Sequence, residues 1–318
     1  TYDARLEIPG WDSPGFDDSG WPPVNTAPIA AGAPILDGST GSPIRLIQEI
    51  QPLTVTEQSP EIYIFDMGQN MGGTVRLSVA GDTGDQIRLR YAEVLNDDGS
   101  IYTENLREAK ATDLYILRGN PDGEVWEPKF TYHGFRYVEI SGFSSKPELD
   151  QLSGLVIHTE MPHTGGFSCS NELLNQLQHN IEWGQRGNYV DVPTDCPQRD
   201  ERQGWMGDAQ VFAATGCYNF ETAGFLTKWL LDVRDSQHDD GCFPDFAPEP
   251  DTFEHNSKTP LRQWRGAPGW ADAGILIPWA AYSRYGDLRL LRDGYPSMKK
   301  YMKFIVDESP NLIGPDFG

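Results

Sequence analysis

The first half of the chain alternates polar and apolar residues over short stretches. Clusters of Gly, Pro, Asn and Asp separate these stretches, which lie between residues 44 and 159. A period of two places apolar side chains on one face of a strand, and short strands at this spacing are typical of an antiparallel β-sandwich. The predicted strands are Arg45–Ile50, Ile62–Phe65, Thr74–Val79, Gln86–Tyr91, Asp113–Leu117 and Arg136–Ile140.

From about Pro162 the apolar period becomes that of a helix. Ser170 is the predicted N-cap of a helix running to about Arg186. Its predicted apolar face consists of Leu173, Leu174, Leu177, Ile181 and Trp183. Further helices are predicted from near Asp208, over Phe220–Ser236, over Trp270–Tyr285 and over Leu288–Val306.

These patterns divide the chain into three parts. Residues 1–43 are rich in turn residues and then in Pro and Ala, and read as the tail of a preceding β-sandwich module plus a linker. Residues 44–160 form the predicted β-sandwich domain, and residues 161–318 form the helical part. The β-sandwich either binds glycans itself or supports the helical part.

The loop between the first two predicted helices has the most distinctive chemistry. Five acids (Asp191, Asp195, Asp200, Glu201 and Asp208) lie close in sequence to Arg199, Arg202 and Trp205, with prolines and glycines between them. Carboxylates accept hydrogen bonds from sugar hydroxyls, and guanidinium groups donate them and tune neighbouring carboxyl pKa values. An indole covers the apolar face of a sugar ring, whereas a merely solvated loop needs no indole. The loop therefore predicts a carbohydrate site.

This loop resembles the active-site segment of the bacterial-type α-L-rhamnosidases, which are inverting glycoside hydrolases. The matching run is Asp191-Val-Pro-Thr-Asp-Cys-Pro-Gln-Arg-Asp-Glu-Arg, then Gly204-Trp and Gly207-Asp-Ala-Gln, with Gln203 and Met206 at variable positions. The resemblance extends over nearly the whole chain. It includes the stretches Tyr63–Gly73, Arg90–Asn96, Phe130–Glu139 and Gly269–Ala273. It implies that the helical part is the N-terminal portion of an (α/α)6 barrel, and that the helical surfaces of such a portion expose apolar residues.

The resemblance also implies roles for individual residues. Glu201 would be the general acid, and Asp195, Arg199, Trp205 and Asp208 would hold the rhamnose ring. Trp270 would add a second wall, although it also suits a core aromatic at a helix start. Burial beside Trp205 raises a carboxyl pKa and nearby arginines lower it, so the sequence leaves the net pKa shift of Glu201 open. The Pro-rich stretch Gly241–Pro250 is a candidate cover for the pocket, because long loops in compact domains are often functional.

An inverting mechanism needs a second carboxylate as general base. In the resembling family this base lies far downstream, so we expect it beyond Gly318 and expect the chain to be a fragment lacking the C-terminal half of the barrel. Glu254 is an available carboxylate, but its sequence context does not mark it as a substitute.

Composition narrows the possible partners. The net charge of −22 argues against nucleic acid and anionic membranes, and no stretch approaches the apolar length of a membrane span. The four cysteines (Cys169, Cys196, Cys217 and Cys242) lack zinc spacing and are predicted to be free thiols. The compartment, cytoplasmic or secreted, stays open, and a homodimer is compatible with the sequence.

We therefore predict an α-L-rhamnosidase that releases terminal α-linked L-rhamnose from glycosides or polysaccharides with inversion. No metal or organic cofactor is implied. Calcium is the alternative use of the acids, but Asp195, Asp200 and Asp208 lack EF-hand spacing and lie among arginines. The alternative functions are another (α/α)6-barrel glycosidase or lyase, and a rhamnose-binding protein without turnover.

Overall fold

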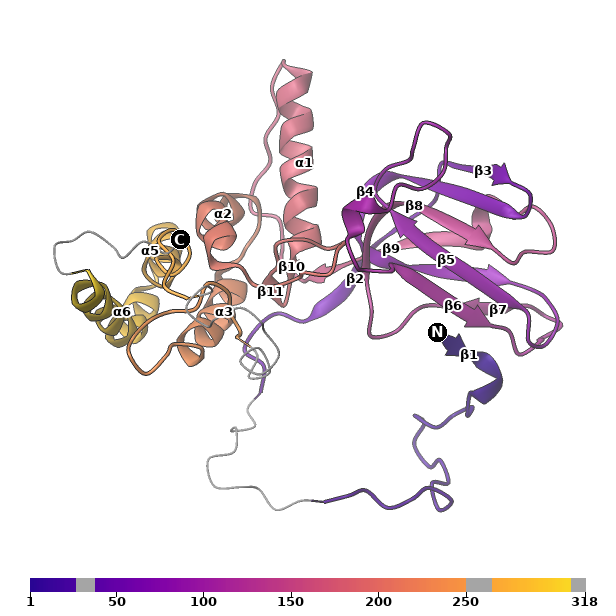
Figure 1. The fold of residues 1–318 in the computed structure, drawn as a ribbon, viewed down its shortest axis with the longest axis horizontal. Helices are drawn as coiled ribbons and strands as arrows, with labels where there is room; N and C mark the ends of the chain where they lie inside the picture. The colour runs from indigo at the N-terminus through magenta and orange to yellow at the C-terminus, as the bar shows by residue number, and fades with distance from the viewer. Residues whose placement is uncertain (27–37, 250–264, 310–318) are drawn as a thin grey trace.

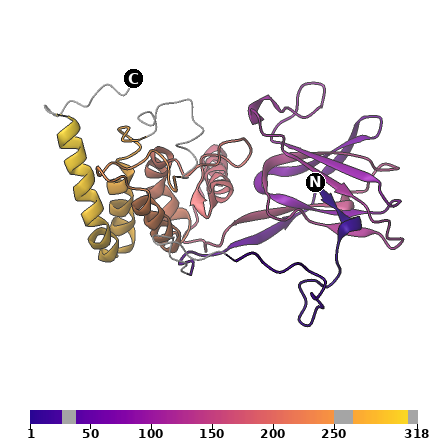
Figure 2. The same ribbon diagram turned by 60° about the horizontal axis from the view of Figure 1, so that its bottom comes forward.

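The computed structural model describes residues 1–26, 38–249 and 265–309. The strands gather in one half of the molecule and the helices in the other (Figures 1 and 2). Helix α1 (Glu172–Asn188) lies where the two halves meet and contacts strands β4 and β9 of the sheet. Within the described ranges, no helix has the length and apolar character that a membrane span requires.

The β half is a curled nine-stranded sheet built around one long strand, β4. Strands follow the order β1-β6-β5-β8-β4-β9-β2, and β3 and β7 also pair with β4. All pairs are antiparallel except β1 with β6. The strands are β1 (Tyr2–Asp3), β2 (Ile44–Ile50), β3 (Thr54–Ser59), β4 (Ile62–Val79), β5 (Gln86–Ala92), β6 (Thr112–Ile116), β7 (Glu124–Trp126), β8 (His133–Ser141) and β9 (Leu152–Thr159).

Strand β4 differs from its sequence prediction. We expected two strands, Ile62–Phe65 and Thr74–Val79, because the residues between them include glycines and polar side chains. The structure contains one continuous strand, and its pairing register with β8 shifts between Asp66 and Met71. The residues that suggested a break therefore form an irregularity within the strand. Met67 and Met71, on either side of them, are buried in the core, each with 2% exposure.

The sheet encloses a dense apolar core. Phe65, Val75, Leu77, Leu89 and Phe135 are all fully buried. The alternation of apolar residues therefore gives these strands the buried face that it predicts. The first strand, β1, joins the edge of this same sheet beside β6. The division of the chain at residues 43 and 160 stays a prediction.

The helical half packs around a second core. Helices α2, α3 and α6 each contact α5, and their shared core includes Trp229, Phe243 and Ile277. The remaining helices are α2 (Met206–Asn219), α3 (Ala223–Asp235), α5 (Ala273–Tyr285) and α6 (Leu288–Glu308). The first turn of α6 is capped by Asp287, whose Oδ1 accepts the Arg289 amide at 3.0 Å.

One prediction about α1 is wrong. Its N-cap is Asn171, whose Oδ1 accepts the Leu173 amide at 3.0 Å, and not Ser170. Both residue types cap helices well, so the sequence alone placed the start one residue early. The predicted apolar face of α1 is largely exposed, with Leu173 at 80% and Leu177 at 52%, as expected for part of a barrel.

Candidate active site

A short hairpin and two loop contacts fix the acidic loop, which we define as residues 191–205. Strands β10 (Tyr189–Val190) and β11 (Val192–Pro193) pair across a turn at Asp191, whose φ is 66°. At the far end, the Asp195 amide donates to the carbonyl of Gln203 at 3.1 Å. The loop therefore closes on itself and holds its side chains in a defined arrangement.

The stretch at the far end of this loop also pairs with the Pro-rich stretch. The Met206 amide donates to the Asp245 carbonyl at 2.8 Å, and the Ala247 amide donates to the Gly204 carbonyl at 3.0 Å. A Cβ on Gly204 would lie 2.1 Å from the Ala247 carbonyl oxygen, so only glycine permits this approach. We predicted that the stretch Gly241–Pro250 covers the pocket. Pro250 lies outside the described residues, and residues 241–249 pack directly against the acidic loop.

Two carboxyl groups form the centre of the loop. Potential ligand atoms of Asp195, Cys196 and Glu201 all lie within 4.8 Å of one another. Arg199 donates to Glu201 Oε2 through Nε at 2.8 Å and to Asp195 Oδ2 through Nη2 at 3.3 Å. The Gln203 amide donates to Asp195 Oδ1 at 2.9 Å. One guanidinium group thus orients both acids.

A second arginine reaches Glu201 from the β half. Arg107 Nη1 lies 2.9 Å from Glu201 Oε2. It directly follows the short 3-10 helix Glu104–Leu106, and its φ of 56° is unusual for a side chain of this size. The sequence did not single out Arg107, because 94 residues separate it from Glu201.

The two carboxyl groups have opposite pKa shifts. Burial raises the pKa of Glu201, but the hydrogen bond and charge of Arg199 and the charge of Arg107 outweigh burial and lower it below its usual value. Burial raises the pKa of Asp195, and the negative charge of Glu201 adds to that rise. Of the two carboxyl groups in the free site, Asp195 therefore has the stronger tendency to hold a proton and Glu201 the weaker.

All six predicted site residues line one cavity of about 410 Å³. They are Asp195, Arg199, Glu201, Trp205, Asp208 and Trp270. Asp208 lies in the first turn of α2, where the helix dipole favours a negative charge. The structure brings these six residues together at one cavity, and the role of each stays a prediction.

Two indoles stand at this cavity. Trp205 packs edge-on against Phe246, with ring centroids 5.2 Å apart. Trp270 precedes α5 and packs on Gly207, where a Cβ would lie 2.9 Å from the indole Nε1. Trp270 is 40% exposed, which does not fit the alternative of a core aromatic.

The sequence missed one acid of this cavity. Asp245 is 3% exposed and lines the cavity, and its Oδ1 accepts the Ala267 amide at 3.1 Å. Burial raises the pKa of Asp245 to about 6. Its position in a Pro-rich stretch gave no chemical signal. Glu254 lies outside the described residues.

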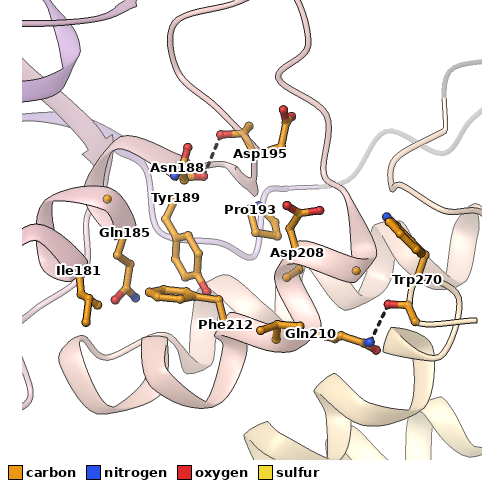
Figure 3. Close-up of a pocket in the computed structure, with 16 residues that line it drawn as sticks. Ile181, Gln185, Asn188, Tyr189, Pro193, Asp195, Asp208, Gln210, Phe212 and Trp270 are labelled. Carbon is orange, nitrogen blue, oxygen red and sulfur yellow. Dashed lines mark hydrogen bonds between the residues drawn. The ribbon is translucent and has the colours of Figure 1, made fainter. Parts of the chain in front are cut away.

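A larger cavity of about 690 Å³ adjoins the first one. It shares Asp195, Asp208 and Trp270 with the smaller cavity, but its floor is formed by Ile181, Tyr189 and Phe212 (Figure 3). Its lining is mainly apolar, whereas the acids and arginines converge on the smaller cavity. We therefore take the cavity of about 410 Å³ as the candidate active site, although the other cavity is larger.

The same carboxyl pair offers a set of metal donors, but its chemistry does not favour a cation. Burial and the neighbouring Asp195 raise the pKa of the Cys196 thiol to about 11, so the thiolate that binds metals is scarce. Arg199 and Arg107 already neutralise Glu201. All four cysteines are free thiols, three of them buried.

Two family models match the chain on either side of the junction. The bacterial alpha-L-rhamnosidase concanavalin-like domain matches residues 56–158. The bacterial alpha-L-rhamnosidase 6 hairpin glycosidase domain matches residues 162–316. The chain belongs to the bacterial α-L-rhamnosidase family. The predicted fold, a β domain followed by part of a six-hairpin barrel, is thereby confirmed.

Relatives in this family are similar over the whole chain. An alpha-L-rhamnosidase of Streptomyces avermitilis is 48% identical over 100% of this chain, and one of Formosa agariphila is 42% identical over 98%. The crystal structure of the Streptomyces avermitilis alpha-L-rhamnosidase complexed with L-rhamnose covers 99% of the chain and 29% of its own, with a TM-score of 0.91. That of Dictyoglumus thermophilum covers 98% of this chain and 34% of its own, at 41% identity and a TM-score of 0.89. The chain spans 30% and 33% of the two curated relatives.

Proposed function

We propose that this chain carries the general acid and the sugar-binding side chains of an enzyme that hydrolyses terminal α-linked L-rhamnosides with inversion. The observation that carries the proposal is the convergence of Glu201, Asp195, Asp208 and two indoles on one cavity of about 410 Å³. Membership of the α-L-rhamnosidase family supports the choice of sugar.

Glu201 is the proposed general acid. It must carry a proton when the glycosidic bond breaks, yet Arg199 and Arg107 favour its ionised form in the free site. Asp195, whose pKa is raised, lies hydrogen-bonded beside Glu201, so both carboxyl groups respond to a change of charge in the site. A substrate that displaces Arg107 from Glu201 removes one positive charge and raises the pKa of the acid.

The remaining side chains bind the ring. Asp208 and Asp195 accept hydrogen bonds from ring hydroxyls, and Asp245 adds a third acceptor. Trp205 and Trp270 cover the apolar side of the deoxy sugar, which has a methyl group at C5. The general base is the carboxylate that family resemblance places downstream of Gly318.

A substrate panel tests this function. We would measure hydrolysis of an aryl α-L-rhamnoside against aryl glucoside, galactoside, mannoside and arabinoside, with this chain and with the longest polypeptide that its gene encodes. We expect the longer polypeptide to hydrolyse the rhamnoside and none of the other glycosides. We also expect the first-formed product to have the inverted anomeric configuration. Turnover of another glycoside in preference to the rhamnoside would contradict the proposed sugar, and retention would contradict the mechanism.

A further inference from the structure

A third cavity, of about 330 Å³, is lined by residues of the acidic loop and of the β half. Its lining comes from Ala109, Ala111 and residues 131–133 of the β half, and from residues 198–202 of the loop. Arg199 and Glu201 line both this cavity and the candidate active site. Glu201 is therefore placed between two cavities, one formed mainly by the helical half and one shared with the β half.

A general acid protonates the oxygen that joins the released sugar to its leaving group. The ring therefore lies on one side of the acid and the leaving group on the other. We propose that the 330 Å³ cavity is the leaving-group subsite, and that it takes the sugar residue to which the cleaved rhamnose is attached. This inference rests on the proposed function, because it assigns the ring to the cavity with Trp205 and Asp208.

The lining selects the chemical class of the leaving group. Asp200, Gln198, Arg202 and Thr131 bring hydrogen-bonding groups to the cavity, and the two alanines and the ring of Tyr132 add apolar surface. A polyhydroxylated ring uses such groups, whereas a flat aromatic aglycone needs an apolar slot. Ligand cavities span roughly 300–1,000 Å³, so a cavity of about 330 Å³ suits a single sugar ring.

The walls of this cavity are held in unusual backbone conformations. Ala111 and Arg202 line it with φ of 38° and 54°, and Phe130, next to lining residue Thr131, has a φ of 58°. Strained non-glycine residues persist where the surrounding structure determines them, and they gather at functional sites. Arg202 also stacks over the Tyr132 ring at 4.5 Å, which joins the loop wall to the β wall.

Phe130 adds a contact surface beside the cavity. Its side chain is completely exposed, although it is a large apolar group. The stretch Phe130–Glu139 matches the family pattern, and the chemistry of the rhamnose pocket does not use it. An exposed aromatic ring, adjacent in sequence to the lining residue Thr131, offers a surface on which the apolar face of a sugar packs.

Ala109→Trp tests the subsite by filling it. Ala109 is half-buried, lines the cavity and is not among the residues with positive φ, so an indole there narrows the space without backbone strain. The variant is made in the longest polypeptide that the gene encodes, and its kcat/KM is measured on two substrates. One is an α-L-rhamnosyl-glucose disaccharide, and the other is α-L-rhamnosyl fluoride, whose leaving group is a single atom. Ala80→Trp, at an exposed position of the β half that lines none of the described cavities, is the matched control.

We expect Ala109→Trp to lower kcat/KM for the disaccharide at least about tenfold more than for the fluoride, because a clash acts only on the bulky leaving group. Phe130→Ala should change the same ratio in the same direction, by about threefold to tenfold, through lost contact with the sugar. The control should leave the ratio unchanged, and thermal unfolding of each variant checks that it folds.

Equal losses on both substrates, or no loss on the disaccharide, would overturn the subsite. A selective loss on a rhamnosylated phenol, with the disaccharide unaffected, would overturn the assignment to a sugar. If the parent protein hydrolyses neither rhamnoside, the proposed function itself fails, and that result is distinct from the other two.

Discussion

The β half and the helical half each bury an apolar core and leave other apolar side chains exposed, but they bring different groups to the candidate active site. Central core residues of the sheet, such as Phe65 and Leu77, are fully buried. In the helical half, Leu173 and Val211 are each 80% exposed, and Trp279 is 58% exposed. The β half exposes apolar residues as well, among them Leu53 at 66% and Val125 at 67%, so both halves present apolar surface that no described residue covers.

This difference assigns different tasks to the two halves. The helical half provides Asp195, Glu201 and Trp205, the groups suited to chemistry. The sheet reaches the acidic loop through Gly134 of β8 and through Arg107. If this division is correct, changes on the sheet should alter the geometry and protonation of the acids without removing any reacting group.

Among changes on the sheet, the largest effect on activity is expected at the contact between β8 and the loop. Ala at Gly134 would place a Cβ 2.8 Å from Pro197 Cγ and 2.9 Å from the Gln198 amide nitrogen. Because the loop must move, Gly134→Ala should lower kcat/KM for an aryl rhamnoside by about 10- to 100-fold. Gly166→Ala is the control, since a Cβ there meets nothing within 4 Å. Unchanged activity of Gly134→Ala would show that the sheet does not position the loop.

A different kind of effect, on stability and not on activity, is expected from the buried acid of the helical half. The pKa of Asp245 is raised to about 6, so the folded state binds its proton more tightly than the unfolded state does. Its contribution to stability is complete below pH about 4 and is lost as pH rises through about 6, and it amounts to on the order of 3 kcal/mol.

Asp245→Asn removes this titration. Urea unfolding at pH 4.5 and pH 7.5 should show that the parent protein loses more stability than the variant between these two values. A parent and variant with the same pH dependence would show that Asp245 titrates normally. Asp240→Asn, at an acid whose pKa is lowered rather than raised, serves as the comparison.

The smallest effect is expected at Arg107. Its charge helps to lower the pKa of Glu201, so Arg107→Ala should raise that pKa. A general acid is active while protonated, and activity falls as pH rises through its pKa. The alkaline limb of the pH profile of kcat/KM should therefore move to higher pH in Arg107→Ala. The control is Arg45→Ala, which breaks an exposed ion pair with Glu160 and should leave that limb in place. A shift to lower pH would contradict the assigned acid.

Local patterns predicted most of the elements and the acidic loop. Alternation identified β2, β5, β6 and β8, and the run around Glu201 brought the acids together because they are neighbours in sequence. Contacts between distant segments could not be predicted in this way. Arg107 and Asp245 reach the site only through the docking of β8 and the packing of residues 241–249, and neither position has a local signal. The exposure of Leu173 likewise depends on what packs against α1, which periodicity does not reveal.

The most direct test of the central claim is the dependence of Glu201→Gln on the leaving group. With the longest polypeptide that the gene encodes, kcat should fall by about 10²- to 10⁴-fold for a rhamnosyl disaccharide, whose leaving group needs a proton. It should fall far less for an activated aryl rhamnoside, and Glu308→Gln, at an exposed helix end, should change neither rate. The same small loss on both substrates would contradict the assignment of Glu201 as the general acid.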